Sequence, residues 1–417
     1  MSSLIIEGGR RLEGEFPVQG AKNAVLPVLA GTILASGKSV VFNCPDLSDV
    51  KNTVEVLENL GCRVKCSSGT IEVDPSDIKS FTIPDNLMRK MRSSIIFLGA
   101  IIARHKKASV SMPGGCEIGL RPIDLHLKAL RSLGIKITES HGYINCSADK
   151  IVGAKIHLDF PSVGATENIM LASCMAEGET IIENAAREPE IVDLQNFLNR
   201  MGAKIEGAGE GIIKIEGVKK LYGVEHTIMP DRIVAGTYLL SAAMTSGQVV
   251  LTSASPSHMG AILNTLTDMG AKIYNEKSRI AIKMSKRPNA IPLVKTMPYP
   301  GFPTDIQSPF MALSAIADGT SMFVENIFEN RYQHVDELLR MGADIRLDGR
   351  CAVVVGVKKL TGAKVVAKEL RGGAALVLAA LSAEGETIIE DIKYIDRGYE
   401  HIEKHLSLLG ADIIRKE

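Results

Sequence analysis

The stretch NRMGAKI (residues 199–205) is one of six copies of a phrase that organises this chain. Each copy predicts the end of an amphipathic helix at a Leu-Gly or Met-Gly pair and then a strand. The other copies are ENLGCRV (58–64), RSLGIKI (131–137), TDMGAKI (267–273), LRMGADI (339–345) and SLLGADI (407–413). Their glycines recur at intervals of 68 to 73 residues, and the string AEGETIIE occurs twice, at 176–183 and 383–390. This regularity indicates a structural unit that is repeated six times.

Each unit also contains a second helical segment, which is more apolar than the first. Five of these segments run up to a glycine: LPVLAGTILASG (26–37), NIMLASCMAEG (168–178), AGTYLLSAAMTSG (235–247), PFMALSAIADG (309–319) and AALVLAALSAEG (374–385). Because these helices are apolar on most faces, we expect them to be buried, with strands covering them. We expect the glycine to end each helix, and a β-rich phrase to follow it. Six such units predict an α/β protein of two domains, each with three units.

Composition excludes several classes of protein. The 417 residues hold 48 basic and 48 acidic side chains, with 4% aromatic residues and no Trp, which argues against a nucleic-acid-binding protein. No apolar run reaches the length of a membrane span, and the N-terminal residues do not resemble a signal peptide, so we expect a cytoplasmic protein. The odd number of cysteines, seven, favours free thiols, and their spacing does not predict a metal site.

One unit carries a lengthened loop, SMPGGCEIGLRP (111–122). In the other five units, 23 to 25 residues separate the glycine after the apolar helix from the next repeat glycine. In this unit, 29 residues separate His105 from Gly134, so the loop holds about five extra residues. Its glycines would let it move as a lid, and Arg121 would tune the pKa of the Cys116 thiol. The alternative is a tolerated insertion with a passive cysteine.

Charged side chains occupy equivalent positions in several units. The same end of corresponding apolar helices carries Lys22, Arg92, Arg371 and Asp305, and a second equivalent position carries Arg331 and Arg397. A Lys at a helix N-terminus opposes the helix dipole unless an anion binds there. Guanidinium groups match the oxygens of carboxylates and phosphates. Taken singly, each residue is better explained as a surface charge or a structural ion pair. Taken together, their placement predicts a site between the domains for an anionic ligand.

Several motifs carry a resemblance to a known family. They are Lys22-Asn23, PGGC (113–116), RPIDLH (121–126), FPSVGATEN (160–168), DRIVAGT (231–237), FPTDIQ (302–307), ENRY (329–332) and IDRGYEHIE (395–403). Together they closely resemble the UDP-N-acetylglucosamine 1-carboxyvinyltransferases, the enolpyruvyl transferases that begin peptidoglycan synthesis. The resemblance spans essentially the whole chain. The repeats alone would not separate this family from its relative that acts on shikimate 3-phosphate, whereas PGGC with RPxDLH would.

The resemblance implies two inside-out α/β barrel-like domains of three units each, one formed by residues 21–229 and the other by 1–20 with 230–417. It implies a site between them that closes when the UDP-sugar binds. The enolpyruvyl group of phosphoenolpyruvate would pass to the 3′-hydroxyl of UDP-N-acetylglucosamine by addition and elimination, with release of phosphate. No metal or cofactor is implied. Epoxides that mimic phosphoenolpyruvate, such as fosfomycin, would alkylate Cys116.

The resemblance also implies a role for individual residues. Cys116 would protonate C3 of phosphoenolpyruvate and form a covalent adduct with it, and Asp305 would be the base for the sugar hydroxyl. Lys22, Arg121 and Arg397 would hold the phosphate and carboxylate. The remaining substrate-binding residues would be Asn23, Arg92, Pro122, Ile123, Asp124, Leu125, Ser162, Val163, Gly164, Ile327, Arg331 and Arg371.

Two positions depart from the family pattern. Glu369 stands where the family phrase has Asp, close to Arg371, and Phe160 stands where some members carry Lys. Two other functions remain open: 3-phosphoshikimate 1-carboxyvinyl transfer on the same scaffold, and a non-catalytic UDP-sugar sensor. An intact set of Cys116, Asp305 and Lys22 argues against the sensor.

Overall fold

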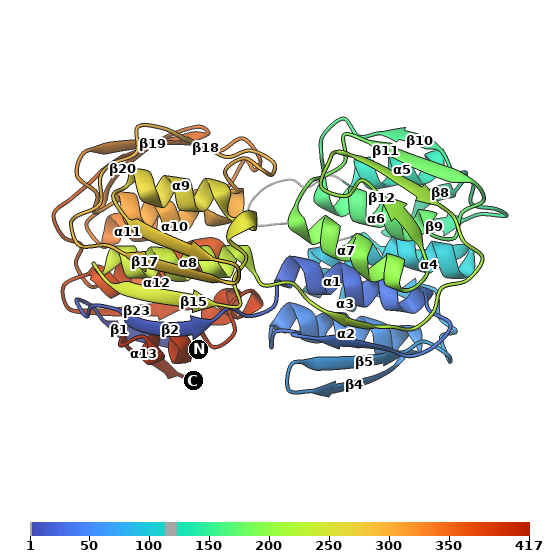
Figure 1. The fold of residues 1–417 in the computed structure, drawn as a ribbon, viewed down its shortest axis with the longest axis horizontal. Helices are drawn as coiled ribbons and strands as arrows, with labels where there is room; N and C mark the ends of the chain where they lie inside the picture. The colour runs from blue at the N-terminus through green and yellow to red at the C-terminus, as the bar shows by residue number, and fades with distance from the viewer. Residues whose placement is uncertain (1, 113–122) are drawn as a thin grey trace. The chain divides into compact units, whose positions relative to one another are not determined.

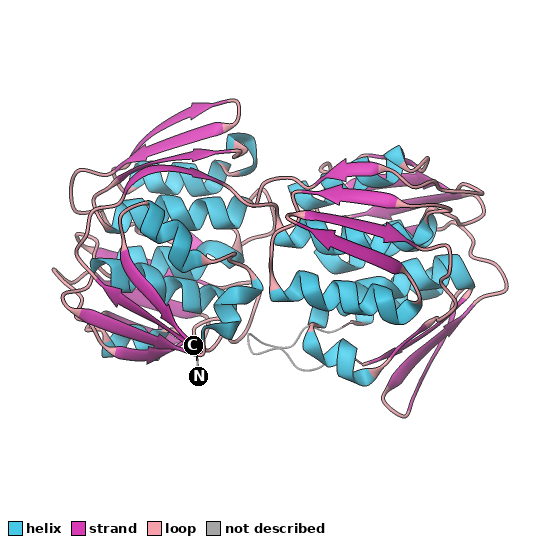
Figure 2. Cartoon of the chain, turned by 90° about the horizontal axis from the view of Figure 1, so that it is seen from below, coloured by secondary structure: helices cyan, strands magenta, loops and turns pink. Residues whose placement is uncertain are grey.

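The structure is a computed structural model that describes residues 2–112 and 123–417. The described residues divide into two compact units. The terminal unit contains both chain ends and consists of residues 2–19 and 230–417, and the middle unit consists of residues 20–112 and 123–229. Each unit has its own hydrophobic core. The predicted α/β class is confirmed, with helices inside each unit and strands around them (Figures 1 and 2).

Apolar helices form the centre of each unit. In the terminal unit these inner helices are α8 (Arg232–Met244), α10 (Thr304–Ser314) and α12 (Leu370–Ser382), and all three pack against one another. In the middle unit they are α1 (Lys22–Gly31) with η1 (Thr32–Leu34), α4 (Phe97–His105) after α3 (Asp85–Lys90) and η2 (Arg92–Ile96), and α6 (Val163–Ser173). Almost every side chain of these helices is buried, as their sequences predict.

The other helices are amphipathic, with one face buried and the other exposed. They are α2 (Ser48–Leu60), α5 (Asp124–Ser132), α7 (Pro189–Arg200), α9 (Gly260–Asp268) after η3 (Pro256–His258), α11 (Val335–Arg340), and α13 (Ile402–Leu408) after η4 (Ile392–Arg397). Each of these six is followed by one of the repeat glycines, and all six glycines have positive φ, from 83° at Gly134 to 104° at Gly202. A residue with a Cβ is strained in this conformation, so glycine is what allows the helix to end and the strand to begin.

Six four-stranded sheets cover the helices of the described residues. In the middle unit their strand orders are β14 (Glu225–Thr227)–β3 (Ser39–Phe42)–β5 (Thr70–Asp74)–β4 (Arg63–Ser67), β6 (Thr82–Ile83)–β7 (Lys107–Ser111)–β9 (Tyr143–Ser147)–β8 (Lys136–Ser140), and β10 (Lys155–His157)–β11 (Glu179–Glu183)–β13 (Ile212–Glu216)–β12 (Lys204–Glu206). In the terminal unit they are β2 (Glu13–Pro17)–β15 (Gln248–Thr252)–β17 (Arg279–Lys283)–β16 (Lys272–Glu276), β18 (Val294–Lys295)–β19 (Thr320–Val324)–β21 (Cys351–Val355)–β20 (Asp344–Asp348), and β22 (Lys364–Val366)–β23 (Glu386–Glu390)–β1 (Ser3–Glu7)–β24 (Asp412–Lys416).

All six sheets share one pairing pattern. The first two strands of each order are parallel and the other neighbours are antiparallel. Alternate residues of each strand point to the core, as in β11 and β23, which share the sequence ETIIE and the same burial pattern. The N-terminal residues complete two of the sheets, because β2 pairs with β15 and β1 lies between β23 and β24. These pairings place both chain ends in one unit.

The inner helices end earlier than the sequence predicts. α6 ends at Ser173, five residues before Gly178, and α12 ends at Ser382, three residues before Gly385. Both glycines have positive φ, but they form the turn that leads into the next strand. The predicted role of these glycines as helix ends is therefore wrong, because the turn into the strand, and not the helix end, needs the left-handed conformation.

The longest helices of the described chain have 13 residues. Among the described residues, none of the helices has the length and apolar character that crossing a bilayer requires.

Candidate active site

A buried group of four charged side chains, here called the Asp305 cluster, lies in the terminal unit. Its members are Asp305, Arg331, Glu369 and Arg371. Arg331 Nη2 lies 2.9 Å from Asp305 Oδ1, and Arg371 Nη2 lies 3.2 Å from Asp305 Oδ2. Both arginines are almost fully buried, whereas the Asp305 side chain is 27% exposed. The two guanidinium groups therefore hold one carboxylate from its buried side and leave an edge of it accessible.

The inner helices position the cluster. Asp305 and Arg371 are each the second residue of their helix, α10 and α12, and these helices pack side by side. Arg331 comes from the segment between β19 and α11, and its Nη2 also donates to the main-chain oxygen of Thr304, 3.2 Å away. It thus binds both the main chain and the side chain of the first turn of α10.

Glu369 caps α12. Its carboxylate accepts hydrogen bonds from the main-chain N–H groups of Arg371 (2.7 Å) and Gly372, and its Oε2 lies 3.8 Å from Arg331 Nη1. Asp is the more usual residue at this position of a helix, but the longer Glu side chain also reaches both donors here. The departure from the family phrase at this position therefore keeps Arg371 in place, and the cluster holds two positive and two negative charges.

A chain of hydrogen bonds fixes the other face of Arg371. Its Nη1 donates to the Tyr399 hydroxyl at 3.3 Å, and that hydroxyl lies 2.9 Å from Thr237 Oγ1. Because Thr237 donates its own proton to the main-chain oxygen of Ile233, Tyr399 is the donor to Thr237. Burial opposes the charge of Arg371, but Asp305 and Tyr399 outweigh burial and raise the pKa of this guanidinium above its ordinary value. Arg371 therefore stays charged.

His334 packs behind the cluster at the start of α11 and is fully buried. Burial first, and then the charge of Arg331, lower the pKa of its imidazole to about 3. Among residues 2–112 and 123–417, neither ring nitrogen has a hydrogen-bond partner. His334 is therefore neutral at physiological pH, so it does not add a third buried positive charge to those of Arg331 and Arg371.

Replacement of His334 by Gln is expected to change how stability depends on pH. As the pH falls below about 6.5, His334 becomes protonated in the unfolded chain. In the folded chain it stays neutral until the pH reaches about 3. This difference lowers the free energy of unfolding by about 2 kcal/mol between pH 7 and pH 5. Guanidinium chloride unfolding at the two pH values should show this loss in the wild type and a smaller loss, by that amount, in the variant. Equal losses would contradict the assignment.

In the middle unit, Lys22 forms a buried ion pair at the start of α1. Its Nζ lies 2.6 Å from Oδ2 of Asp49, in the first turn of α2, and the side chains are 11% and 1% exposed. Lys22 is the first residue of α1, as the sequence predicts, and Asn23 beside it is half-buried. Asp49 thus supplies a negative charge next to the position where the sequence predicts an anionic ligand.

The two segments predicted to bind the nucleotide meet at His126. Ser162 caps α6 by accepting a hydrogen bond from the Ala165 N–H, and Val163 and Gly164 begin that helix. A Cβ on Gly164 would lie 3.1 Å from Cε1 of His126, so glycine allows this close approach. His126 Nδ1 lies 2.7 Å from Nδ2 of Asn168, which fixes the imidazole. The structure therefore brings residues 123–126 together with 162–164.

The remaining predicted residues are distributed as follows. Ile123 precedes α5 and is half-buried, Asp124 begins α5 and is exposed, and Leu125 is half-buried. Arg92 begins η2 in the middle unit. Arg397 ends η4, two residues before Tyr399, and Ile327 follows β19; both belong to the terminal unit. Phe160 is exposed. Cys116, Arg121 and Pro122 lie outside the described residues.

The contacts of several residues in these groups carry no signal in the sequence. Asp49 is distant in the chain from Lys22, and no motif marks it. Tyr399 belongs to the quoted IDRGYEHIE motif, but Arg371 and Thr237, which it contacts, lie far from it in the chain. His126 is part of the quoted RPIDLH motif, but its contact with Gly164 depends on the packing of α5 against α6. The repeat positions could have drawn attention to Asp49, since it opens the amphipathic helix after Lys22.

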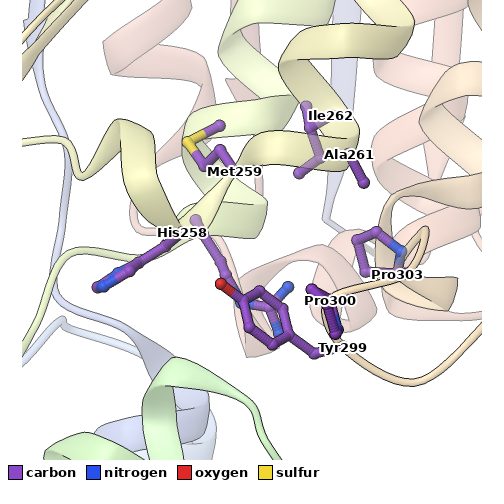
Figure 3. Close-up of a pocket in the computed structure, with 9 residues that line it drawn as sticks. His258, Met259, Ala261, Ile262, Tyr299, Pro300 and Pro303 are labelled. Atoms are coloured by element: carbon purple, nitrogen blue, oxygen red, sulfur yellow. The ribbon is translucent and has the colours of Figure 1, made fainter. Parts of the chain in front are cut away.

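A small pocket lies beside the start of α8. Met259, Ala261 and Ile262 lie on one side of it and Tyr299 and Pro300 on the other (Figure 3). The Arg232 guanidinium, also in its lining, lies over the Tyr299 ring at 5.5 Å. Its volume of about 10 Å³ is close to the least that holds one water molecule, so it is too small for phosphoenolpyruvate or a sugar nucleotide. Among the described residues, no group of three or more His, Cys, Asp or Glu side chains is placed to hold a metal ion.

Comparison with known proteins places the chain in a family. The model of the EPSP synthase (3-phosphoshikimate 1-carboxyvinyltransferase) family matches residues 6–406. Two solved structures share the fold: the enolpyruvyl transferase NikO from Streptomyces tendae, with a TM-score of 0.89 at 24% identity, and EPSP synthase from Acinetobacter baumannii, with a TM-score of 0.77 at 20% identity. Both alignments cover 100% of this chain and at least 99% of the other.

Relatives with higher sequence identity show to which group of enzymes within this family the chain belongs. UDP-N-acetylglucosamine 1-carboxyvinyltransferase 2 of Caldanaerobacter subterraneus subsp. tengcongensis is 56% identical over 415 residues, and the match covers 100% of this chain and 100% of its own. UDP-N-acetylglucosamine 1-carboxyvinyltransferase of Geobacter metallireducens is 50% identical over 100% of this chain and 99% of its own. The chain therefore belongs to the EPSP synthase family of enolpyruvyl transferases and, within it, to the UDP-N-acetylglucosamine 1-carboxyvinyltransferases.

Proposed function

We propose that this enzyme transfers the enolpyruvyl group of phosphoenolpyruvate to the 3′-hydroxyl of UDP-N-acetylglucosamine and releases phosphate. The observation that carries the proposal is full-length identity of up to 56% with relatives of that name. The Asp305 cluster supports it, because a carboxylate held by two buried guanidinium groups is a fixed acceptor for a hydroxyl proton. The proposal includes a cytoplasmic role in peptidoglycan synthesis, with consequences for cell shape and division.

The reaction proceeds by addition and then elimination. The Cys116 thiol gives its proton to C3 of phosphoenolpyruvate, which leaves C2 electron-poor. The 3′-oxygen of the sugar bonds to C2 while Asp305 accepts the hydroxyl proton. A proton then passes from C3 to the Cys116 thiolate as the C2–O bond to phosphate breaks, which restores the double bond. The proton held by Asp305 goes to the departing phosphate, which is released as inorganic phosphate. Cys116 also forms a covalent adduct with phosphoenolpyruvate at C2, and fosfomycin alkylates the same thiol.

The accessible edge of Asp305 suits this task. Each carboxylate oxygen accepts a guanidinium N–H, and a carboxylate oxygen can accept more than one hydrogen bond. A hydroxyl that approaches the exposed edge can therefore bind without displacing either arginine. Arg331 and Arg371 act through Asp305 in this proposal, as positioning residues, and they also contribute positive potential for the anionic substrates.

The anionic groups of the substrates are assigned to residues of both units. Lys22, Arg121 and Arg397 bind the phosphate and carboxylate of phosphoenolpyruvate, Arg92 adds positive charge, and Asn23 binds polar substrate atoms. Residues 121–125 and 162–164 bind the uridine diphosphate, and Ile327 contacts the sugar. The start of α6 suits a phosphate, since its first main-chain N–H groups have no acceptor within the helix.

One assay distinguishes this function from its two alternatives. Phosphate release from phosphoenolpyruvate should require UDP-N-acetylglucosamine and should not occur when shikimate 3-phosphate replaces the sugar. Release with shikimate 3-phosphate would favour the related transferase. Binding of UDP-N-acetylglucosamine in calorimetry, without phosphate release, would favour a sensor.

A further inference from the structure

A second buried carboxylate, Glu325, lies at the end of β19. It contacts the segment that contains Asp305 and the segment that contains Ile327. The side chain is completely buried. Its Oε1 accepts hydrogen bonds from Thr296 Oγ1 at 2.9 Å, from the Ile327 N–H at 2.8 Å and from the Phe328 N–H at 3.1 Å. Its Oε2 accepts one from Thr304 Oγ1 at 3.0 Å. Four donors therefore converge on two oxygens, so both oxygens of the Glu325 carboxylate act as hydrogen-bond acceptors.

The direction of these bonds is determined by the neighbouring groups. Thr296 Oγ1 accepts a hydrogen bond from the Asn326 N–H at 2.8 Å, so the single hydroxyl proton of Thr296 goes to Glu325. The Asn326 side chain donates back to the Thr296 main-chain oxygen at 3.2 Å. The loop 325–328 is thereby bound to the end of β18 as well as to Glu325, and its position relative to that strand is fixed.

The other oxygen of Glu325 reaches the catalytic end of α10. Thr304 is the first residue of α10, directly before Asp305, and its main-chain oxygen accepts from Arg331. The Arg331 guanidinium in turn lies 5.7 Å from the centre of the Phe328 ring. Glu325 therefore binds the residue before Asp305, the amide of Ile327 and the residue whose ring lies against Arg331.

We propose that Glu325 is a positioning residue for the transfer reaction, which holds Asp305 and Ile327 in a fixed mutual geometry. The inference rests on the proposed function, in which Asp305 is the base and Ile327 contacts the sugar. Glu325 itself touches neither substrate. A displacement of Asp305 by about 1 Å relative to the sugar hydroxyl would slow the reaction up to about 100-fold, and would leave the binding of phosphoenolpyruvate unaffected.

Two substitutions test the proposal. Glu325→Gln keeps the shape of the side chain but replaces one acceptor oxygen with an N–H₂ group, which donates. Thr304→Val removes only the hydrogen bond between Glu325 and the first residue of α10. Both should lower kcat by about 10- to 100-fold, with the KM for phosphoenolpyruvate unchanged within about twofold. Thr304→Ser keeps the hydroxyl and should restore most of kcat. Glu329→Gln is the matched control, because Glu329 is an exposed partner of Arg350 in the same segment, and it should leave kcat unchanged.

Hydrogen exchange gives a readout that does not depend on the reaction. In the full-length Glu325→Gln protein, peptides that cover 301–306 and 325–330 should exchange faster than in the wild type, whereas Glu329→Gln should not change them. Unchanged exchange, or an unchanged kcat in both Glu325→Gln and Thr304→Val, would overturn the proposal. If the wild type releases no sugar-dependent phosphate, the proposed function fails, and the exchange comparison alone then decides whether Glu325 holds the two segments.

Discussion

A Cys116→Ala protein is expected to lose sugar-dependent phosphate release by about 1,000-fold while it still binds UDP-N-acetylglucosamine. Alanine cannot donate a proton, so C3 of phosphoenolpyruvate would have to be protonated from water. The measurement is turnover at saturating concentrations of both substrates, together with calorimetry for the UDP-sugar. Cys116→Asp should retain part of the turnover, since a carboxylic acid can also donate a proton. Full activity of the alanine variant would contradict the assigned role.

The other thiols provide the control for this experiment. Burial raises the pKa of Cys44, Cys62, Cys146 and Cys174 to about 12, so each is almost entirely protonated and unreactive at neutral pH. Mass spectrometry after treatment with fosfomycin should therefore find the adduct on the peptide that contains Cys116 and on none of these four. Cys66 is exposed, and Cys66→Ser should change neither turnover nor alkylation. An adduct on one of the buried thiols would show that their environment differs from the one described.

Two substitutions of Asp305 are expected to separate catalysis from stability. Asp305→Asn should lower kcat by about 100- to 1,000-fold, because an amide cannot accept the hydroxyl proton. Its carbonyl oxygen can still accept one guanidinium N–H, so the loss of stability should be moderate. Asp305→Ala should lower kcat similarly and in addition lower the free energy of unfolding by about 3 kcal/mol, because two buried guanidinium groups then lose their carboxylate. Denaturant unfolding and steady-state kinetics measure the two effects.

Asp318 offers a matched control for these variants. It is an exposed partner of Arg287 in the same unit, and its replacement by Asn should change neither kcat nor stability by a measurable amount. If Asp305→Ala unfolds at the same denaturant concentration as the wild type, the guanidinium groups are not held as described. If Asp305→Asn retains full turnover, Asp305 is not the base that accepts the proton of the sugar hydroxyl.

The repeated parts of the fold could be predicted from the sequence because the physics behind them is local. Gly202 and its five counterparts must adopt positive φ where a helix gives way to a strand, and the structure confirms this at all six positions. Burial of the inner helices follows in the same way from their apolar faces. The pairing of the N-terminal strands could not be derived from the local pattern, because β1 and β2 pair with strands that lie hundreds of residues away. Only the family resemblance implied that residues 1–20 join residues 230–417.

In the candidate site, too, features set by local sequence could be predicted and contacts between distant residues could not. Lys22, Asp305 and Arg371 could be recognised because they stand at the same end of corresponding helices, and all three begin their helices in the structure. The pairing of Asp305 with Arg331, 26 residues away, and of Lys22 with Asp49 could not be predicted, since side-chain contacts depend on how the helices pack. The equivalent positions of Arg331 and Arg371 in the repeats, together with the family resemblance, predict that both bind the substrate. In the structure both bind Asp305, and their contact with substrate stays a prediction.

The proposed reaction moves the enolpyruvyl group from phosphoenolpyruvate to the 3′-hydroxyl of UDP-N-acetylglucosamine. The most direct test is to incubate the purified protein with both compounds and to follow phosphate and the sugar nucleotide together by NMR. One enolpyruvyl ether should form at the sugar 3′-oxygen for each phosphate released, and no phosphate should appear without the sugar nucleotide. Phosphate release that is independent of the sugar, or an unchanged UDP-N-acetylglucosamine spectrum, would contradict it.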